Sequence, residues 1–180
     1  MTLAVRIREL RESDSPYYIA WINDRELVKF NSNYAPVSDF QHRDWFAAVS
    51  RRKDMRIFTI EVEHEGQAMV IGSCSLRNLD SLTRSAELQI RIGEAAFRDK
   101  GLGTKVVRML LEHGFDDMNL NRIHLEVFAA NERAIQTYRK CGFVVEGVKR
   151  AAAFRGGHYQ DIMLMSVLKS EYDSHSSSAG

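Results

Sequence analysis

Hydrophobic and polar residues alternate along several stretches of the chain, which is the pattern of half-buried β-strands. In the stretch 85–92 (SAELQIRI), Ala86, Leu88, Ile90 and Ile92 alternate with Ser85, Glu87, Gln89 and Arg91. Because successive side chains of a strand point to opposite faces, this stretch predicts one apolar and one polar face. Comparable patterns predict strands at 3–8, 56–63, 68–76, 122–130, 144–150 and 158–168. The segment 64–67 (HEGQ) predicts a hairpin turn between two of them.

Helical spacing fills most of the intervening segments. Ser13 or Asp14 is expected to cap a helix that carries Tyr17, Tyr18, Ile19, Trp21 and Ile22. A second helix is predicted over 39–51, burying Phe40, Trp45, Phe46 and Val49. A third should run from the glycines at 101 and 103 to about Met118, and a short fourth should follow Asn131 and end at Gly142. This order of elements predicts a mixed α/β architecture whose sheet is neither all-parallel nor all-antiparallel.

Length and charge narrow the classes of protein to consider. The 180 residues fit one domain, predicted over 1–170, followed by a flexible polar tail over 171–180. The net charge of +1 gives no broad footprint for nucleic acid or an anionic membrane, so any anion site must be local. No apolar run approaches the roughly 18 residues of a membrane span.

The cysteines and histidines favour neither disulfide nor metal chemistry. Cys74 and Cys141 lie far apart without a CxxC spacing, and the 6 histidines show no spacing typical of metal ligands. We therefore expect no bound metal and a reducing, cytoplasmic location.

A glycine-containing loop, Arg98-Asp99-Lys100-Gly101-Leu102-Gly103, directly precedes the third predicted helix. It fits neither a Walker-type phosphate loop nor a dinucleotide-binding fingerprint, because Thr104 precedes Lys105 and the third glycine position is Val106. Amides at the first turn of a helix can hold an anion, each such interaction contributing about 0.3–1 kcal/mol. Several amides together with Arg98, Lys100 and Lys105 could hold a pyrophosphate. An ordinary strand-to-helix turn explains the hexapeptide equally well.

A second motif, Asn131 to Phe143 (NERAIQTYRKCGF), fits the pattern NxxAxxxYxKxGF about thirty residues after RxxGxG. Together the two motifs resemble those of the GNAT superfamily of acyl-CoA-dependent N-acetyltransferases, strongly over 84–165 and more loosely before that. The resemblance implies an α+β fold with a sheet of about seven mostly antiparallel strands, splayed in the middle, and four helices. It also implies acetyl-CoA as co-substrate, bound in the splay.

The resemblance assigns residues to the cofactor. The amides from Arg98 to Thr104 would hold the pyrophosphate, and the backbone of Leu88 to Ile92 would pair with the pantetheine arm like an added strand. Asn131 would hydrogen-bond the arm, although an asparagine here is equally suited to cap the following helix. The predicted cofactor-binding residues are Leu88, Ile90, Arg91, Ile92, Arg98, Asp99, Lys100, Gly101, Leu102, Gly103, Thr104, Asn131, Ala134 and Tyr138.

Acetyl transfer to an amine requires a neutral nitrogen and a proton for the departing thiolate. An alkyl ammonium has a pKa near ~10.4, so a positioned base is useful at neutral pH. The family resemblance makes Tyr138 the general acid; its helical spacing alone would suit a core tyrosine. Glu87 is the candidate base, and a solvated strand face is the alternative. His124 and Glu126 are further candidates, with a structural role favoured.

The acceptor is less determined by the sequence. The second half of the chain resembles spermidine and ribosomal-protein N-acetyltransferases, and the front half resembles enzymes that acetylate nucleotide-linked amino sugars. Trp21, Asn23 and Tyr159 are predicted to contact the acceptor, and the acidic residues Asp24, Glu26, Asp39 and Asp44 could attract a cation, unless they only solvate helix surfaces. We expect acetylation of a small primary amine such as a polyamine or amino sugar. A peptide N-terminus and a non-catalytic acyl-CoA sensor are the alternatives, and a homodimer is possible.

Overall fold

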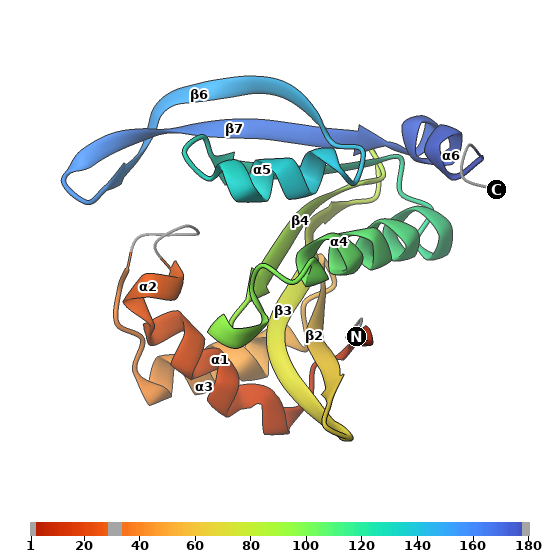
Figure 1. Cartoon of the computed structure of the whole chain (residues 1–180). Coiled ribbons are helices and arrows are strands. Elements are labelled where there is room, and N and C mark those ends of the chain that lie inside the picture. The colour runs from red at the N-terminus through yellow and green to blue at the C-terminus, as the bar shows by residue number, and fades with distance from the viewer. Residues whose placement is uncertain (1–2, 29–33, 178–180) are drawn as a thin grey trace.

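The structure is a computed structural model that describes residues 3–28 and 34–177 (Figure 1). The strands are β1 (Val5–Glu9), β2 (Met55–His64), β3 (Gln67–Asp80), β4 (Ser85–Ile92), β5 (Arg122–Phe128), β6 (Val144–Arg155) and β7 (His158–Leu168). The α-helices are α1 (Ser15–Asn23), α2 (Arg25–Val28), α3 (Asp39–Val49), α4 (Leu102–Glu112), α5 (Glu132–Arg139) and α6 (Lys169–Ser177). Short 3-10 turns cover Glu12–Asp14 and Ala95–Phe97, and α4 continues into a π-helical turn, His113–Asp117.

The strands form a 7-stranded sheet in the order β1-β2-β3-β4-β5-β7-β6. Every neighbouring pair is antiparallel except β4 and β5, which are parallel. The pairing of β4 with β5 extends only from Ser85 to Glu87, whereas its pairing with β3 continues to Ile92. The sheet is therefore splayed between β4 and β5, as predicted, and β6 and β7 arch away from β4 (Figure 1).

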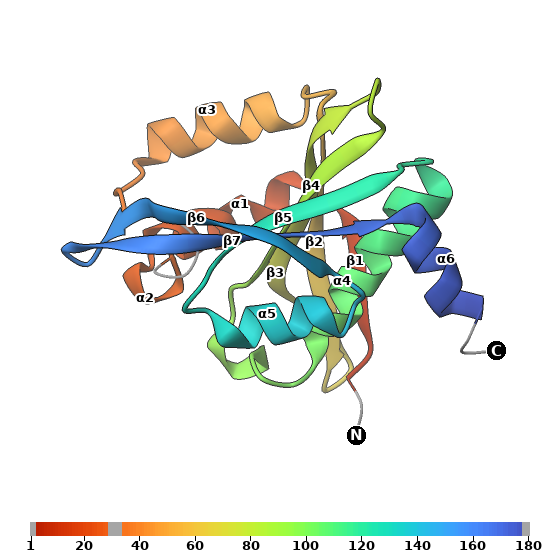
Figure 2. The same ribbon diagram turned by 90° about the horizontal axis from the view of Figure 1, so that it is seen from above.

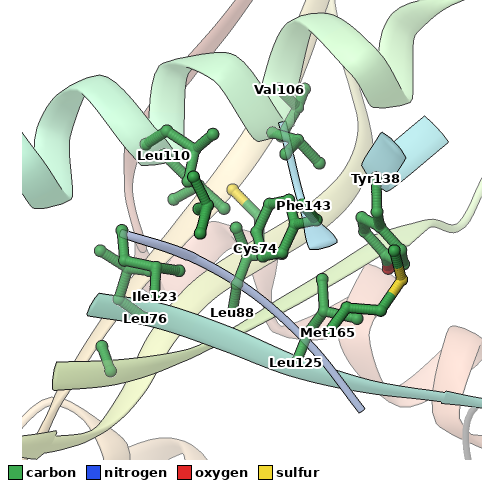
Figure 3. Packing of buried hydrophobic residues seen from close by; sticks show 14 of the residues in the cluster. Cys74, Leu76, Leu88, Val106, Leu110, Ile123, Leu125, Tyr138, Phe143 and Met165 are labelled. Atoms are coloured by element: carbon green, nitrogen blue, oxygen red, sulfur yellow. The ribbon is translucent and has the colours of Figure 1, made fainter. Parts of the chain in front are cut away.

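Helices cover the sheet from two sides. Viewed from above, α3 lies on one side of the strands and α4 and α5 lie on the other (Figure 2). The main core fills the space between the sheet and α4, where Val106 and Leu110 pack over Leu76, Leu88 and Ile123 (Figure 3). α4 keeps the i, i+4 spacing of apolar residues that such packing requires.

The hairpin between β2 and β3 turns where the sequence predicts. Glu65 and Gly66 both adopt a positive φ, 52° and 75°. A two-residue turn with two left-handed residues matches the right-handed twist of the paired strands. The predicted segment 64–67 thus joins strands whose residues 61–64 pair in register with residues 67–70, up to a register shift between Ile60 and Glu61.

The buried face of α3 differs from the predicted one. Phe40 is 73% exposed and Trp45 is 41% exposed, whereas His42 is buried together with Val49. His42 turns this face inward because its Nε2 lies 3.0 Å from both the hydroxyl and the carbonyl oxygen of Ser15 on α1. These hydrogen bonds favour the observed rotation of α3. Of the four residues predicted to be buried, Val49 is buried and Phe46 is half-buried, whereas the prediction was wrong for Phe40 and Trp45.

The end of the chain contains a helix within the stretch where the composition predicts a flexible tail. α6 packs through Tyr172, whose ring centroid lies 5.1 Å from that of Phe115. Lys169 Nζ also lies 2.5 Å from Asp116 Oδ1. These contacts anchor the start of α6 to the π-helical turn; residues 178–180 lie outside the described part of the chain.

Candidate active site

The edge of β4 that faces β5 is unpaired from Leu88 to Ile92, because the two strands separate after Glu87 and His124. β5 turns instead to β7, with which it pairs along its whole length. Backbone donors and acceptors along an unpaired edge can bind an extended ligand as if it were another strand. The splay thus leaves room and hydrogen-bonding groups for an elongated arm beside Leu88, Ile90 and Ile92.

The glycine loop lies at the end of this open edge and begins α4. Gly101 is the N-cap residue, with φ of 73°, and no side chain caps the helix. A residue with a side chain is disfavoured in this left-handed conformation, which explains the glycine. The first amides of α4 consequently have no partner within the helix and present the positive end of its dipole to an anion. A Cβ on residue 103 would lie 3.9 Å from Thr137 Cγ2 on α5, which is an ordinary contact distance, so packing against α5 does not require a glycine at this position.

Two basic side chains in this region, predicted to help hold an anion, instead form hydrogen bonds to the backbone of other segments. Arg98 donates hydrogen bonds to the carbonyl oxygens of Ile92 and Gly93, at 3.2 and 2.6 Å. Lys105 Nζ donates to the carbonyl oxygen of Leu3 at 3.2 Å. Arg98 and Lys105 therefore tie the loop to β4 and to the start of the chain, which leaves the backbone amides as the candidate anion-binding groups.

A cavity of about 890 Å³ connects the open edge, the glycine loop and the start of α5. All the predicted cofactor-binding residues line it except Lys100, whose Nζ lies 5.3 Å above the Phe97 ring. The cavity also reaches Glu87, so the sheet brings the two predicted motifs and the candidate base together.

Asn131 caps α5, as one of its two predicted roles requires. Its Oδ1 accepts a hydrogen bond of 3.2 Å from the amide of Ala134. Within the described chain its Nδ2 makes no hydrogen bond, and the residue lines the large cavity. The carboxamide can therefore cap the helix through oxygen and still donate to a ligand through nitrogen.

Tyr138 lies on α5 at the wall of the cavity and is 8% exposed. Its ring centroid lies 5.7 Å from that of Phe143, and both residues belong to the main core (Figure 3). Burial raises the pKa of Tyr138 to about 12, so the hydroxyl stays protonated through the neutral range. No hydrogen bond engages this hydroxyl in the described residues, which leaves its proton available.

Glu87 sits at the point where β4 and β5 part, and both of its carboxylate oxygens are engaged. Arg77 Nη2 donates to Oε1 at 2.5 Å and Asn78 Nδ2 donates to Oε2 at 2.8 Å. A carboxylate has about four acceptor positions, so it can still accept a proton or bind a water molecule. The ion pair also gives Glu87 a structural function.

The predicted acceptor-binding residues do not line the cavities. Trp21 is buried, donates from Nε1 to Glu94 at 3.0 Å, and packs against Gly93, where a Cβ would lie 2.1 Å from its ring. Asn23 exchanges two hydrogen bonds with the backbone of Val37, at 3.0 and 2.9 Å, and so positions that loop. Tyr159 is 69% exposed and packs on Phe154 at the tip of the β6–β7 hairpin.

The remaining candidates have structural surroundings. His124 lies next to Glu87 across the last β4–β5 pair but outside the lining of both cavities. Glu126 pairs with Lys149 at 2.5 Å. Burial raises the pKa of the Cys74 and Cys141 thiols, which makes both poor nucleophiles.

A second cavity, of about 440 Å³, lies between α1, α3 and strands β2 to β4. It shares Arg77, Gln89, Ile90 and Arg91 with the large cavity, so the two adjoin along β4. Sequence reasoning assigned Arg91 only through its backbone and missed its side chain. The strict alternation of 85–92 contained this signal, because it puts Arg91 on the face of Glu87 and Gln89.

Two further properties concern the described residues, 3–28 and 34–177. None of the helices there combines the length and the hydrophobicity that crossing a bilayer requires. Nor do three or more His, Cys, Asp or Glu side chains gather there in a way that could hold a metal ion.

Comparison with known proteins places these features in context. Residues 4–144 match the family model described as acetyltransferase (GNAT) domain. The spermidine N(1)-acetyltransferase of Vibrio cholerae is 35% identical over 117 residues, 65% of each chain, and that of Escherichia coli K12 is 27% identical over 94% of this chain and 88% of the enzyme. The putative ribosomal N-acetyltransferase YdaF of Bacillus subtilis is 27% identical, covering 95% and 93%.

A solved structure extends the similarity to three dimensions. The crystal structure of the Vibrio cholerae spermidine N-acetyltransferase in complex with CoA and spermine matches with a TM-score of 0.86. Its sequence identity is 28%, and the match covers 93% of this chain and 97% of that chain.

Proposed function

The chain belongs to the GNAT family of acetyl-CoA-dependent N-acetyltransferases, and we propose that its acceptor is the primary amine of a small molecule. The observation that carries the proposal is the open edge of β4, which runs from the uncapped start of α4 to the junction of two cavities. The large cavity suits the long coenzyme, and the second, at about 440 Å³, has the size of a small-molecule site.

The relatives support a small acceptor over a peptide. Two of them are named for spermidine, and the relative named for ribosomal acetylation is described as putative. A peptide N-terminus would need a groove that continues beyond the reacting amine. The second cavity is bounded on one side by α1 and α3, on which Tyr18, His42 and Trp45 form part of its wall.

In the proposed complex the coenzyme is held mainly by backbone. The amides at the start of α4 bind the diphosphate, and the open edge from Leu88 to Ile92 pairs with the pantetheine arm. Nδ2 of Asn131 donates a hydrogen bond to the same arm. Acetyl-CoA supplies the thioester, whose acyl carbon the amine attacks in a ternary complex.

The protons of the reaction have candidate partners in the described residues. The acceptor ammonium loses two protons on its way to the amide, and the thiolate takes up one, so the reaction releases one proton overall. Tyr138 is the proposed donor to the thiolate, because its buried hydroxyl is protonated and free. Glu87, directly or through a water molecule, is the proposed acceptor of the ammonium proton.

Steady-state kinetics with acetyl-CoA and a panel of amines tests this function. We expect thiol release that depends on a small primary amine, and peptides with free N-termini should react at least ten times more slowly in kcat/KM. Tight binding of CoA without turnover of any small amine would contradict the proposal. Faster reaction of a peptide would move the acceptor to the protein class.

A further inference from the structure

The second cavity continues from the reaction centre along the polar face of β4. Glu87, Gln89 and Arg91 share this face, and neighbours two residues apart on a strand are separated by ~6–7 Å. Gln89 and Arg91 line both cavities, whereas Glu87 lines only the large one. An acceptor whose amine reaches the junction would therefore extend its far end toward Arg91.

The charged residues that line this second cavity are positive. Its described lining residues include Arg52, Arg77 and Arg91 but neither an aspartate nor a glutamate. Two of the three arginines are already neutralised, Arg77 by Glu87 at 2.5 Å and Arg52 by Asp54 at 2.6 Å. Arg91 makes no hydrogen bond or ion pair with any described residue, and its Nε is fully buried.

An unpaired guanidinium in such a place is unfavourable. Burial lowers the pKa of Arg91, since the charge has lost water without gaining a counter-ion. Arginine nevertheless stays protonated in proteins, so its five N–H groups require acceptors. An oxyanion would supply both the charge and the acceptors, and the fork of the guanidinium matches a carboxylate or a phosphate.

We propose that the second cavity binds the far end of the acceptor and that this end carries a carboxylate or phosphate held by Arg91. The inference rests on the proposed function, which it narrows to amines that also carry an anionic group. Tyr18, Ile57 and Trp45 provide apolar and aromatic walls for the body of such a molecule.

A purely cationic acceptor fits this lining poorly. Asp24, which could have attracted one, accepts hydrogen bonds from the amides of Glu26 and Leu27 and so caps α2. Asp39 and Asp44 are exposed on α3 outside the cavity, and Glu26 lines the large cavity and not this one. A polyamine in this cavity would place an ammonium near Arg91 without a carboxylate between them.

Four amines of matched length distinguish the possibilities: 5-aminopentanoate, 4-aminobutyl phosphate, pentylamine and 1,5-diaminopentane. In steady-state assays with acetyl-CoA, we expect kcat/KM for at least one anionic amine to exceed that for pentylamine about 10-fold, with the diamine lowest. The better of the first two identifies the carboxylate or the phosphate. Equal values for all four amines, or a preference for the diamine, would overturn the proposal.

A binding measurement separates this inference from the proposed function. We would titrate each compound calorimetrically into the protein–CoA complex, where no turnover is needed. Arg91-dependent binding of an anionic amine without acetylation would support the anion site and contradict the proposed function. Failure of both anionic amines to bind, or binding that does not depend on Arg91, would overturn the anion site itself.

The variant Arg91→Gln tests the residue, with Arg56→Gln as the matched control. Loss of a hydrogen-bonded charge pair should raise KM for the anionic amine about 10- to 100-fold. Arg56 is exposed on β2 and donates only to the carbonyl oxygens of Lys53 and Met55, so its loss should leave KM unchanged. Removing an unpaired buried charge should also leave Arg91→Gln at least as stable as the parent protein. An unchanged KM for the anionic amine in a folded Arg91→Gln protein would show that Arg91 does not bind the anionic group.

Discussion

Arg77 and Glu87 face each other across β3 and β4, and the guanidinium donates a hydrogen bond of 2.5 Å to the carboxylate. This pair stands at the point where the sheet opens and where the two cavities meet. Glu87 neutralises the charge of Arg77, which lines both cavities, whereas the charge of Arg91 has no counter-ion among the described residues. The proposed base and the proposed anion site are thus parts of one arrangement of charges on the polar face of β4.

The first prediction concerns Glu87. If it accepts the ammonium proton, Glu87→Gln should lower kcat by about 100-fold at pH 7, and this deficit should shrink as the pH rises, because more of the amine (pKa ~10.4) is then already neutral. Rate profiles from pH 6 to 9 measure both effects. A variant with a lower melting temperature but a rate profile of unchanged shape would show that Glu87 only holds Arg77.

The second prediction concerns Tyr138. Tyr138→Phe keeps the ring in the core and removes the hydroxyl, so we expect kcat to fall about 100-fold while the Kd of CoA changes less than 2-fold. Steady-state rates and calorimetry provide the two numbers. Tyr17→Phe, at a half-exposed tyrosine of α1, is the control and should have parental activity. Parental turnover of Tyr138→Phe would remove this residue from the mechanism.

The third prediction concerns the backbone of the glycine loop. Gly101 has φ of 73° and a Cβ there would meet nothing within 4 Å, so Gly101→Ala introduces only conformational strain, about 1–2 kcal/mol. We expect the Kd of CoA to rise about tenfold as the loop relaxes. Gly66→Ala is the matched control, because Gly66 has φ of 75° and equally open surroundings in the β2–β3 turn. It should lose similar stability and bind CoA normally; weakened binding in both variants would rule out a local role for the loop.

The fourth prediction concerns a buried ion-pair network whose members line neither cavity. Arg8 lies 2.7 Å from Asp14 and 2.6 Å from Glu61, with all three side chains less than 10% exposed. Burial alone would raise the pKa of both carboxyls. Hydrogen bonds from Arg8, from the Arg11 amide and from Thr59 to Asp14, and from Arg8 and Arg6 to Glu61, together with the charges of these arginine side chains, outweigh burial and leave each pKa below its ordinary value. Arg8→Met leaves the buried Asp14 without a cation and Glu61 with Arg6 alone, and it should cost about 3 kcal/mol of unfolding free energy at pH 7.

The pH dependence of this variant has a definite sign. In the parent protein the carboxyl pKa values are lower in the folded than in the unfolded state. The contribution of the network is therefore complete above the unfolded values near ~4 and is lost as the pH falls through the folded values. In Arg8→Met, Asp14 lacks its cation and Glu61 keeps only Arg6, so both carboxyls protonate more readily and the deficit of the variant should shrink between pH 7 and pH 4. Urea denaturation at both pH values measures this, and Arg11→Met, in an exposed pair, should show little change at either.

The sequence predicted those features that depend on neighbours along the chain. The alternation of 85–92 gave β4 its two faces, and the positive φ of Gly101 follows from a glycine that directly precedes a helix. The spacing of the two motifs led through family resemblance to the splayed sheet. These signals are local or shared by many related chains, so the sequence alone is enough to detect them.

The features that the sequence did not predict arise from contacts between distant segments. The side chain of Arg98 turns to the carbonyl groups of Ile92 and Gly93 instead of a phosphate. His42 is buried because Ser15 of another helix offers a hydrogen-bonding partner, and Phe40 is exposed as a result. The isolation of Arg91 depends on which partners Arg77 on β3 and Arg52 before β2 have taken. No local pattern contains that information.

The contact between β4 and β5 is only three residue pairs long, so a substrate bound beside it would also stabilise the fold. In the proposed complex a pantetheine arm between β4 and β5 would act as an eighth strand, joining β1 to β4 with β5 to β7 for as long as the ligand is bound. Because such a ligand binds only the native state, acetyl-CoA at 100 times its Kd would add about 2.7 kcal/mol to the unfolding free energy. Free CoA retains the same arm and diphosphate, so the spent carrier would bridge the halves equally well and compete with the next acetyl-CoA.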